Sequence, residues 1–166
     1  EHDLNLKDFK NVELPENLTV QGNLLANGRM DLKKNLKVTK ELDLSGSGTY
    51  KLPEGLDVKD LNIFDTNVEE LPRDIKIRGN LMAKFSQLIK LPDGLKIPGE
   101  CDISHTPIEV LPKKFKVGGE LDLMETQIKS LPDDLQVGDA IYLDDDWNVE
   151  GDRQIQVPEH LKEQIY

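Results

Sequence analysis

The sequence contains few of the residues that fill a compact globular core. Aromatic residues make up 5% of its 166 residues, and hydrophobic residues of all kinds make up 37%. This composition disfavours a globule around one large core. It suits a stack of small repeated units, because each unit needs only a few aliphatic side chains facing its neighbours. The length indicates a single domain, residues 1–166.

The chain also has little with which to form cross-links or to enter a membrane. Cys101 is the single cysteine, so an internal disulfide framework is excluded. No apolar run approaches the roughly 18 residues of a membrane span. Residues 1–12 show no signal segment, although a signal removed by processing stays an alternative. We therefore expect no membrane partner.

Positive charge is scarce. The chain has 32 acidic against 21 basic side chains, which gives a net charge of −11. Nucleic acids are polyanions, so direct binding to nucleic acid is disfavoured. A protein partner with a basic surface fits this charge. An acidic surface that only maintains solubility fits it equally well.

The chemistry of an active site is missing from the sequence as well. There is no nucleophile–base pair, phosphate-binding loop or metal-ligand cluster, which predicts a protein that is not an enzyme and holds no cofactor. His2, His105 and His160 occupy different environments without metal-ligand spacing, and His105 falls in a turn where we expect it to be exposed. Cys101 falls on a predicted core position, so we expect an unreactive, buried thiol.

What the chain does contain is a repeat. The doublet Leu-Pro returns at a nearly constant interval, and Leu32, followed by Lys33, fills the one gap. The steps between successive leucines are 18, 20, 19, 20, 20 and 20 residues. A constant period of this length is typical of stacked coils. The leucines that mark the period are Leu14, Leu32, Leu52, Leu71, Leu91, Leu111 and Leu131.

Within a repeat, apolar residues alternate over short stretches. Phe115 and Val117 are two apart, as are Leu121 and Leu123, and alternation of this kind is typical of strands. Gly118-Gly119 between the two pairs permits a corner. No repeat holds a helical pattern of ten or more residues. Each coil should therefore consist of two short strands and two corners, with adjacent coils about 4.8 Å apart.

A column of hydroxyl side chains accompanies the repeat. Its members lie five residues after the first core residue of the second strand. A buried hydroxyl at this place can bond to the backbone of the turn, so we interpret the column as structural. Its members are Thr66, Ser86, Thr106 and Thr126.

The stretch Leu121-x-Leu123-x-x-Thr126-x-Ile128-x-x-Leu131-Pro132 resembles the bacterial leucine-rich repeat, Leu-x-Leu-x-x-Asn-x-Leu-x-x-Leu-Pro. Threonine replaces the usual asparagine, and the match runs from about residue 4 to 143. The array is most similar to the short repeats of effectors secreted by Gram-negative pathogens. The resemblance implies a mainly β, leucine-rich-repeat-like parallel β-solenoid of about seven coils. It also implies a protein partner on the strand face and leaves two locations open, a host cell after secretion or the cytoplasm.

The two ends differ from the middle, as the capping of an array requires. Residues 1–13 form an N-terminal partial coil, in which Leu4 and Leu6 correspond to Leu121 and Leu123. Residues 144–166 form an insertion followed by a C-terminal cap. Its last part, residues 158–165, has proline in the first turn and is expected to form a short helix over the last open strand edge.

Three columns on and beside the second strand are expected to point outward together. They form an acidic sheet face with apolar side chains set into it. Like charges about 5 Å apart repel by roughly 0.9 kcal/mol even in water, and a basic partner would relieve this repulsion. The predicted partner-binding residues are Glu41, Asp43, Asp60, Asn62, Phe64, Met82, Glu100, Asp102, Glu120, Asp122, Met124, Tyr142 and Trp147.

Basic side chains form a column of their own on the first strand. Lys96 and Lys116 each precede a glutamate by four residues, so ion pairs with Glu100 and Glu120 are one interpretation. A second contact surface is the other. The members of the column are Lys37, Lys76, Lys96 and Lys116.

The insertion at 144–152 is rich in acids. Asp146-x-Asn148-x-Glu150-Gly151 resembles the start of a calcium loop, but Val157 stands where the final acid is required. A solvated acidic loop is therefore favoured over a calcium site. Trp147 either folds back on the last coil or forms a contact point.

These features favour a monomeric, non-catalytic scaffold for protein–protein interaction, acting as an effector or inhibitor through its acidic, partly apolar face. The alternative is an inhibitor that mimics a polyanion and blocks a nucleic-acid-binding protein. A third possibility is a piece of an enzyme whose catalytic domain lies elsewhere.

Overall fold

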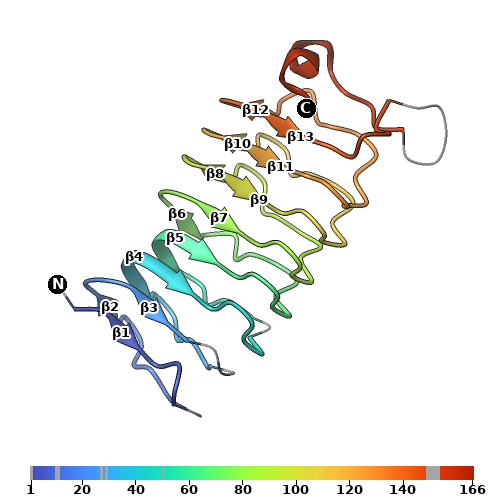
Figure 1. Cartoon of the computed structure of the whole chain (residues 1–166). Helices are drawn as coiled ribbons and strands as arrows, with labels where there is room; N and C mark the ends of the chain where they lie inside the picture. Colours follow the sequence, from blue (N-terminus) through green and yellow to red (C-terminus); the bar gives the residue numbers. More distant parts are fainter. Residues whose placement is uncertain (1, 10–11, 27, 29, 50, 149–153) are drawn as a thin grey trace.

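A computed structural model shows the chain as an elongated parallel β-solenoid (Figure 1). It describes residues 2–9, 12–26, 28, 30–49, 51–148 and 154–166. The chain winds through about seven coils and ends in a short 3-10 helix, η1 (Glu159–Gln164). The predicted fold class is therefore confirmed. Within the described residues, no helix has the length and apolar character needed to cross a bilayer.

Successive coils pair through parallel strands, most of them two residues long. Leu121 lies opposite Cys101 on one side and Ile141 on the other, so the twenty-residue period keeps equivalent residues in register. The strands are β1 (Leu4–Asn5), β2 (Thr19–Val20), β3 (Leu24–Leu25), β4 (Lys37–Asp43), β5 (Asp57–Asn62), β6 (Lys76–Ile77), β7 (Leu81–Met82), β8 (Lys96–Ile97), β9 (Cys101–Asp102), β10 (Lys116–Val117), β11 (Leu121–Asp122), β12 (Gln136–Val137) and β13 (Ile141–Tyr142).

The corner between the two strands of a coil differs along the array. From β6 onward a glycine breaks the chain into two strands, and a Cβ on Gly79 would lie 2.2 Å from Oδ1 of Asp60. In β4 and β5 the corner carries larger residues, and one strand continues through it. The register between these strands shifts between Val38 and Glu41, because the corner of β5 is one residue shorter than that of β4.

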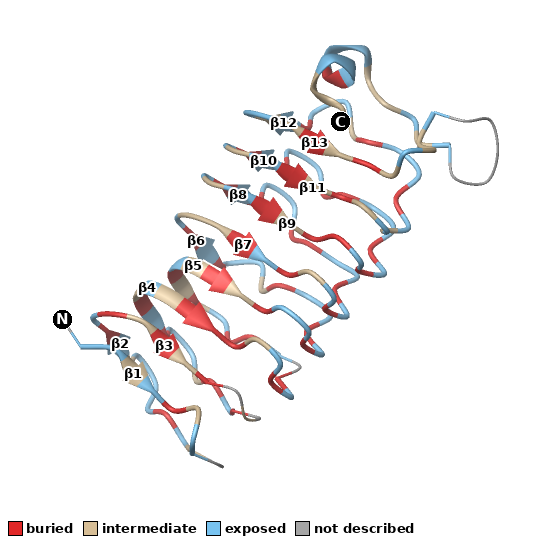
Figure 2. Ribbon diagram, viewed as in Figure 1, coloured by how far each residue is buried: buried red, intermediate tan, exposed pale blue. Residues whose placement is uncertain are grey.

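The core is a set of aliphatic columns inside the coils. Figure 2 marks the buried residues along the successive coils. Phe115 is the largest fully buried side chain among the described residues. Cys101 is 1% exposed and occupies the column between Leu81 and Leu121, as predicted. Burial raises the pKa of its thiol, so Cys101 packs as a small hydrophobic residue and is not a reactive nucleophile.

The hydroxyl column is structural in three of its four members. Thr66 Oγ1 donates to the carbonyl of Ile63 at 2.8 Å. Thr106 and Thr126 donate in the same way, three residues back, at 2.6 and 2.7 Å. Ser86 is the exception, because its buried Oγ has no hydrogen-bond partner among the described residues.

The C-terminal cap closes the last coil as predicted. Ile165 pairs in parallel with Ile141 and so continues the sheet beyond β13. The Gln164 side chain donates from Nε2 to the carbonyls of Val137 at 2.9 Å and Asp139 at 2.8 Å. These bonds satisfy carbonyls that would otherwise face solvent at an open strand edge.

Candidate protein-interaction face

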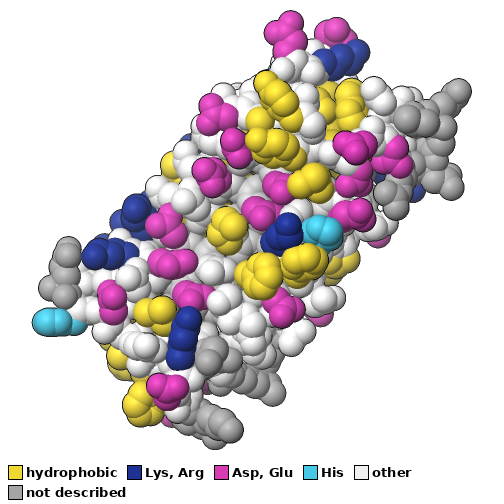
Figure 3. Space-filling model, viewed as in Figure 1, with side chains coloured by type: hydrophobic (Ala, Val, Ile, Leu, Met, Phe, Trp, Pro, Cys, Tyr) yellow, Lys and Arg dark blue, Asp and Glu magenta, His cyan; other side chains and the backbone are white. Residues whose placement is uncertain are grey.

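The second strands place the predicted outward column on one continuous surface. Met82 lies opposite Asn62 and Asp102, and Asp122 lies opposite Asp102 and Tyr142. Figure 3 shows this surface, with apolar side chains gathered near its middle beside a lysine and a histidine and surrounded by acids. The structure thus places Asn62, Met82, Asp102, Asp122 and Tyr142 of the predicted face side by side in successive coils.

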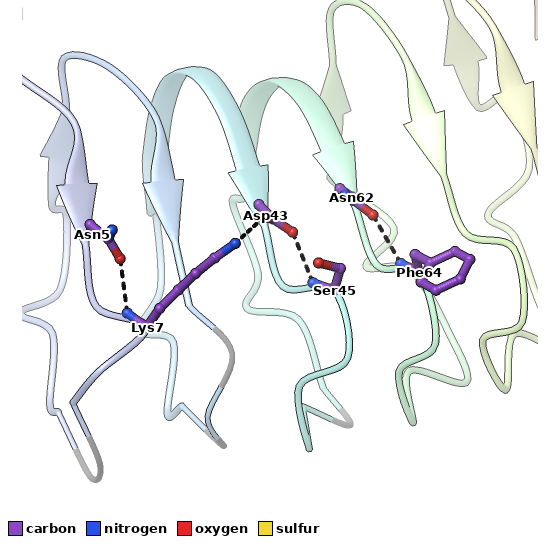
Figure 4. Close-up of polar contacts among 6 residues, drawn as sticks. All are labelled: Asn5, Lys7, Asp43, Ser45, Asn62 and Phe64. Atoms are coloured by element: carbon purple, nitrogen blue, oxygen red, sulfur yellow. Dashed lines mark hydrogen bonds and ion pairs between the residues drawn. The ribbon is translucent and has the colours of Figure 1, made fainter.

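The acids and amides of this column also hold the turns that follow the strands. Asn62 Oδ1 accepts the backbone N–H of Phe64 at 3.1 Å, and Asp43 Oδ1 accepts that of Ser45 at 3.0 Å (Figure 4). Asp102 and Asp122 make the same bond at 3.0 Å to the residue two positions on. This role was not predicted from the sequence. Its signal is an Asp or Asn placed directly before a turn in successive coils.

A neighbouring column connects one coil to the next. Asp60 Oδ1 accepts the backbone N–H of Asn80 at 2.8 Å, and Asn80 Oδ1 accepts that of Glu100 at 2.9 Å. Asn23 does the same for Glu41 at 3.0 Å. Asp60 therefore belongs to a structural ladder. The side chains of Glu100 and Glu120 are exposed at the end of it.

Two acids at the N-terminal end of the face have cationic partners. Lys7 Nζ lies 3.0 Å from Asp43 Oδ2 (Figure 4), and Lys59 Nζ lies 3.6 Å from Asp60 Oδ2. Burial acts to raise the pKa of Asp43, but hydrogen bonds from Ser45 and Lys7 outweigh it and hold the pKa below its ordinary value. The pKa of Glu41 is raised, first by burial and then by the nearby carboxylates.

The acids farther along the face lack such partners. Among the described residues, neither Asp102 nor Asp122 forms an ion pair with a lysine or arginine. Burial, followed by the charge of Asp102, raises the pKa of Asp122 above its ordinary value. Glu120 raises the pKa of the Tyr142 hydroxyl. This part of the face therefore carries negative charge that the fold does not neutralise.

Exposed apolar side chains lie beside these acids. Met82 is 38% exposed and Phe64 39%. Phe85, which is 43% exposed, meets Phe64 edge-on with ring centroids 5.6 Å apart. On its other side, Phe85 stacks on His105 at 4.5 Å with an interplanar angle of 25°. Neither Phe85 nor His105 was predicted from the sequence to belong to the face. His105 was predicted to be exposed, as it is.

The last three apolar residues of the predicted face are less accessible. Met124 and Tyr142 are half-buried, and the Tyr142 ring tilts against Tyr166 with centroids 6.2 Å apart. Trp147 is half-buried and packs against the core, and its carbonyl accepts the N–H of Ile155 at 2.8 Å. Trp147 thus folds back on the last coil, which was one of the two predicted arrangements.

The calcium hypothesis depends on Glu150 and Gly151, which lie outside the described residues. Across the parts of the chain that the structure does describe, no three His, Cys, Asp or Glu side chains are placed to hold a metal ion.

The lysine column lies on the first strands, away from the acidic face. Lys96 and Lys116 are exposed and lie opposite one another in β8 and β10. The ion pairs proposed for them with Glu100 and Glu120 are not formed among the described residues.

An open groove of about 710 Å³ lies on the Leu-Pro edge of the first coils. Its lining mixes apolar residues such as Met30 with charges of both signs. Two of its lysines are already paired, Lys33 with Asp31 and Lys34 with Glu54. The groove therefore offers neither an enclosed pocket nor a surplus of one charge.

Neither a scan against protein-family models nor searches of curated proteins and of solved structures finds a match to this chain. The fold and the face define a class, a parallel β-solenoid with an exposed surface that is acidic and partly apolar. Its function has to be argued from that surface.

Proposed function

We propose that the protein is a non-catalytic repeat scaffold that binds another protein with a basic surface through the face of its second strands. The observation that carries this proposal is the cluster of Phe64, Met82 and Phe85, each about two-fifths exposed, beside the unneutralised Asp102 and Asp122. Apolar anchors within a charged surround are the usual arrangement of a protein interface.

The two kinds of side chain supply different parts of the binding. Covering the exposed portion of Met82 and of the two phenylalanines contributes about 1 kcal/mol for each side chain. The carboxylates add less affinity, but they raise the association rate and select basic partners. The buried state of Cys101 also supports a non-catalytic role, since the one thiol of the chain is withheld from solvent.

The resemblance to effector repeats adds the proposal that the partner is a target protein whose activity the complex blocks. The polyanion-mimic alternative has one observation in its favour, the register that stacks Asp102 on Asp122. The row of charge is interrupted by Met82 and Tyr142 in the same column, so we favour a mixed apolar and charged partner surface. Competition with DNA for a basic protein, relieved by salt, distinguishes the alternative.

The test is a comparative pull-down from candidate host and bacterial lysates with the immobilised protein. The Met82→Glu, Phe64→Ser double variant should lose the basic proteins that the unmodified chain retains. Lys96→Glu is the matched control, because it changes an exposed residue on another face and should retain them. Retention of the same proteins by the double variant, with its circular dichroism unchanged, would remove the face assignment.

A further inference from the structure

The coil that contains β7 departs from its neighbours at three positions, and each departure gives up local stability. Met82 stands where Asn62 and Asp102 accept a turn hydrogen bond. Phe85 stands in a left-handed turn position, with a φ of 60°. Ser86 leaves its buried hydroxyl without a partner among the described residues. When several residues of one coil each lower its stability, they indicate a role other than folding.

Phe85 is the clearest of the three. The same turn position is held by Gly46, Asp65, His105 and Glu125 in other coils, all with positive φ. A bulky aromatic residue is rare in this region because its Cβ crowds the backbone. Phe85 does not fill the core in return, since 43% of it is exposed. The turn thus adopts a strained conformation at a residue whose aromatic ring lies at the surface.

The ring of Phe85 has two aromatic neighbours and one cationic neighbour. His105 stacks on it at 4.5 Å, and Phe64 meets it edge-on. The ammonium group of Lys84 lies 5.4 Å from the centroid of the Phe85 ring, within the range of a cation–π contact. Phe85 and His105 together form a partly exposed pair of stacked rings, which we call the Phe85–His105 stack.

Lys84 also connects the stack to the acids of the face. Its charge acts on Asp122, as does the nearby Asp102, although no ion pair with either is formed among the described residues. A cation between this ring and these carboxylates is attracted by both. Lys84, on a flexible stem, occupies that place without a fixed contact to a carboxylate.

We propose that the Phe85–His105 stack binds an arginine side chain of the partner, with Asp102 and Asp122 as its counter-ions and Lys84 as the group that it displaces. This inference rests on the proposed function and names the chemistry recognised at the same face. Arginine fits better than lysine, because its planar guanidinium stacks on aromatic rings, is more weakly hydrated and presents several donors to carboxylates.

The experiment uses two capped peptides, hexa-arginine and hexalysine, titrated calorimetrically into the purified protein at low salt. The unmodified chain should bind hexa-arginine about fivefold more tightly than hexalysine. Phe85→Asn should remove this preference and leave a similar, charge-driven affinity for both peptides. Asparagine is chosen because it tolerates the left-handed turn. Lys84→Gln should strengthen the binding of both peptides about two- to fivefold, because the competing cation is gone.

Phe9→Asn is the matched control. Phe9 is 59% exposed in a turn of the first coil, outside the stack, so its replacement should leave the arginine preference unchanged. Equal affinity for the two peptides in the unmodified chain overturns the inference, and so does a preference that survives Phe85→Asn. Both results leave the proposed function standing. Retention of captured proteins by the Met82→Glu, Phe64→Ser variant overturns the proposed function, even if the peptide preference is intact.

Discussion

The N-terminal and C-terminal halves of the outward face use the same hydrogen bonds but balance their charge differently. Asp43 and Asp122 each fix the turn that follows their strand through Oδ1. Asp43 also has Lys7 at 3.0 Å, whereas Asp122 has no ion-pair partner among the described residues. An acid can therefore stabilise the turn through its hydrogen bond whether or not a cation neutralises its charge. The charge that is not neutralised lies beside the Phe85–His105 stack.

The largest expected effect tests the difference between a corner that carries glycine and a corner that does not. Gly118→Ala should destabilise the protein by about 1–3 kcal/mol, because the added Cβ would lie 2.1 Å from the carbonyl oxygen of Pro98. Thr39→Ala, at the corresponding corner of β4, should change stability by less than about 0.5 kcal/mol. Chemical denaturation of both variants measures the contrast, and equal losses would contradict it.

The next prediction concerns Asp122. Asp122→Asn keeps an acceptor for the turn and removes a charge, so it should stabilise the fold at pH 7 by up to about 1 kcal/mol. The folded-state pKa of Asp122 is raised, so the charged carboxyl opposes folding above that pKa. The penalty disappears below the unfolded pKa, near 3.9. Denaturation at pH 7 and pH 3 should therefore show a gain that vanishes in acid, whereas Asp122→Ala, which also loses the turn bond, should show none.

Asp43 should behave in the opposite way. Its folded-state pKa is lowered, so the charged carboxylate stabilises the fold above the unfolded pKa, and this contribution is lost as pH falls through the folded pKa. Asp43→Asn should destabilise by about 0.5–1 kcal/mol at pH 7 and change little at pH 2. A gain in stability at pH 7 would remove the distinction between the two halves.

Phe85→Asn should separate stability from binding. Relief of left-handed strain contributes about 1–2 kcal/mol, and loss of the ring contacts with Phe64 and His105 costs about 0.5–1.5 kcal/mol each. These nearly cancel, so the midpoint of thermal unfolding should move by only a few degrees. A large loss of stability would show that Phe85 serves folding.

A modest effect is expected at Ser86. Ser86→Thr should add the bond that Thr66 makes to the carbonyl three residues back, and so stabilise by about 0.5–1 kcal/mol. The corresponding Thr106→Ser should cost a similar amount. Urea denaturation resolves both changes, and an unchanged midpoint for Ser86→Thr would show that this coil cannot adopt the bond.

The repeat made most of the fold predictable. The Leu-Pro period fixes which residues share a column, so the core position of Cys101, the place of the hydroxyl column and the outward face all follow from counting. The folded-back position of Trp147 did not follow, because the insertion has no repeat to compare with. The proline in the first turn of residues 158–165 was enough to indicate a capping helix.

The repeat period did not predict the hydrogen bonds and ring contacts that side chains form within a column. The turn bonds of Asp102 and Asp122 depend on a side chain folding back on its own backbone, which column position alone does not specify. Phe85 was missed because other coils hold polar residues or glycine in its slot, and its importance comes from a ring contact 4.5 Å away in the next coil. The strands β4 and β5 are continuous because their corners lack glycine. The repeat period does not predict this difference, because it does not depend on which residues stand at the corner.

The parallel register described for β9, β11 and β13 has a consequence for recognition. A surface that repeats every coil is nearly unchanged when a ligand slides along it by one step of about 4.8 Å. Charge alone would therefore permit several equivalent alignments. The coil with Met82, Phe85 and Ser86 differs from its neighbours, so a partner that binds as proposed would have one preferred alignment along the array.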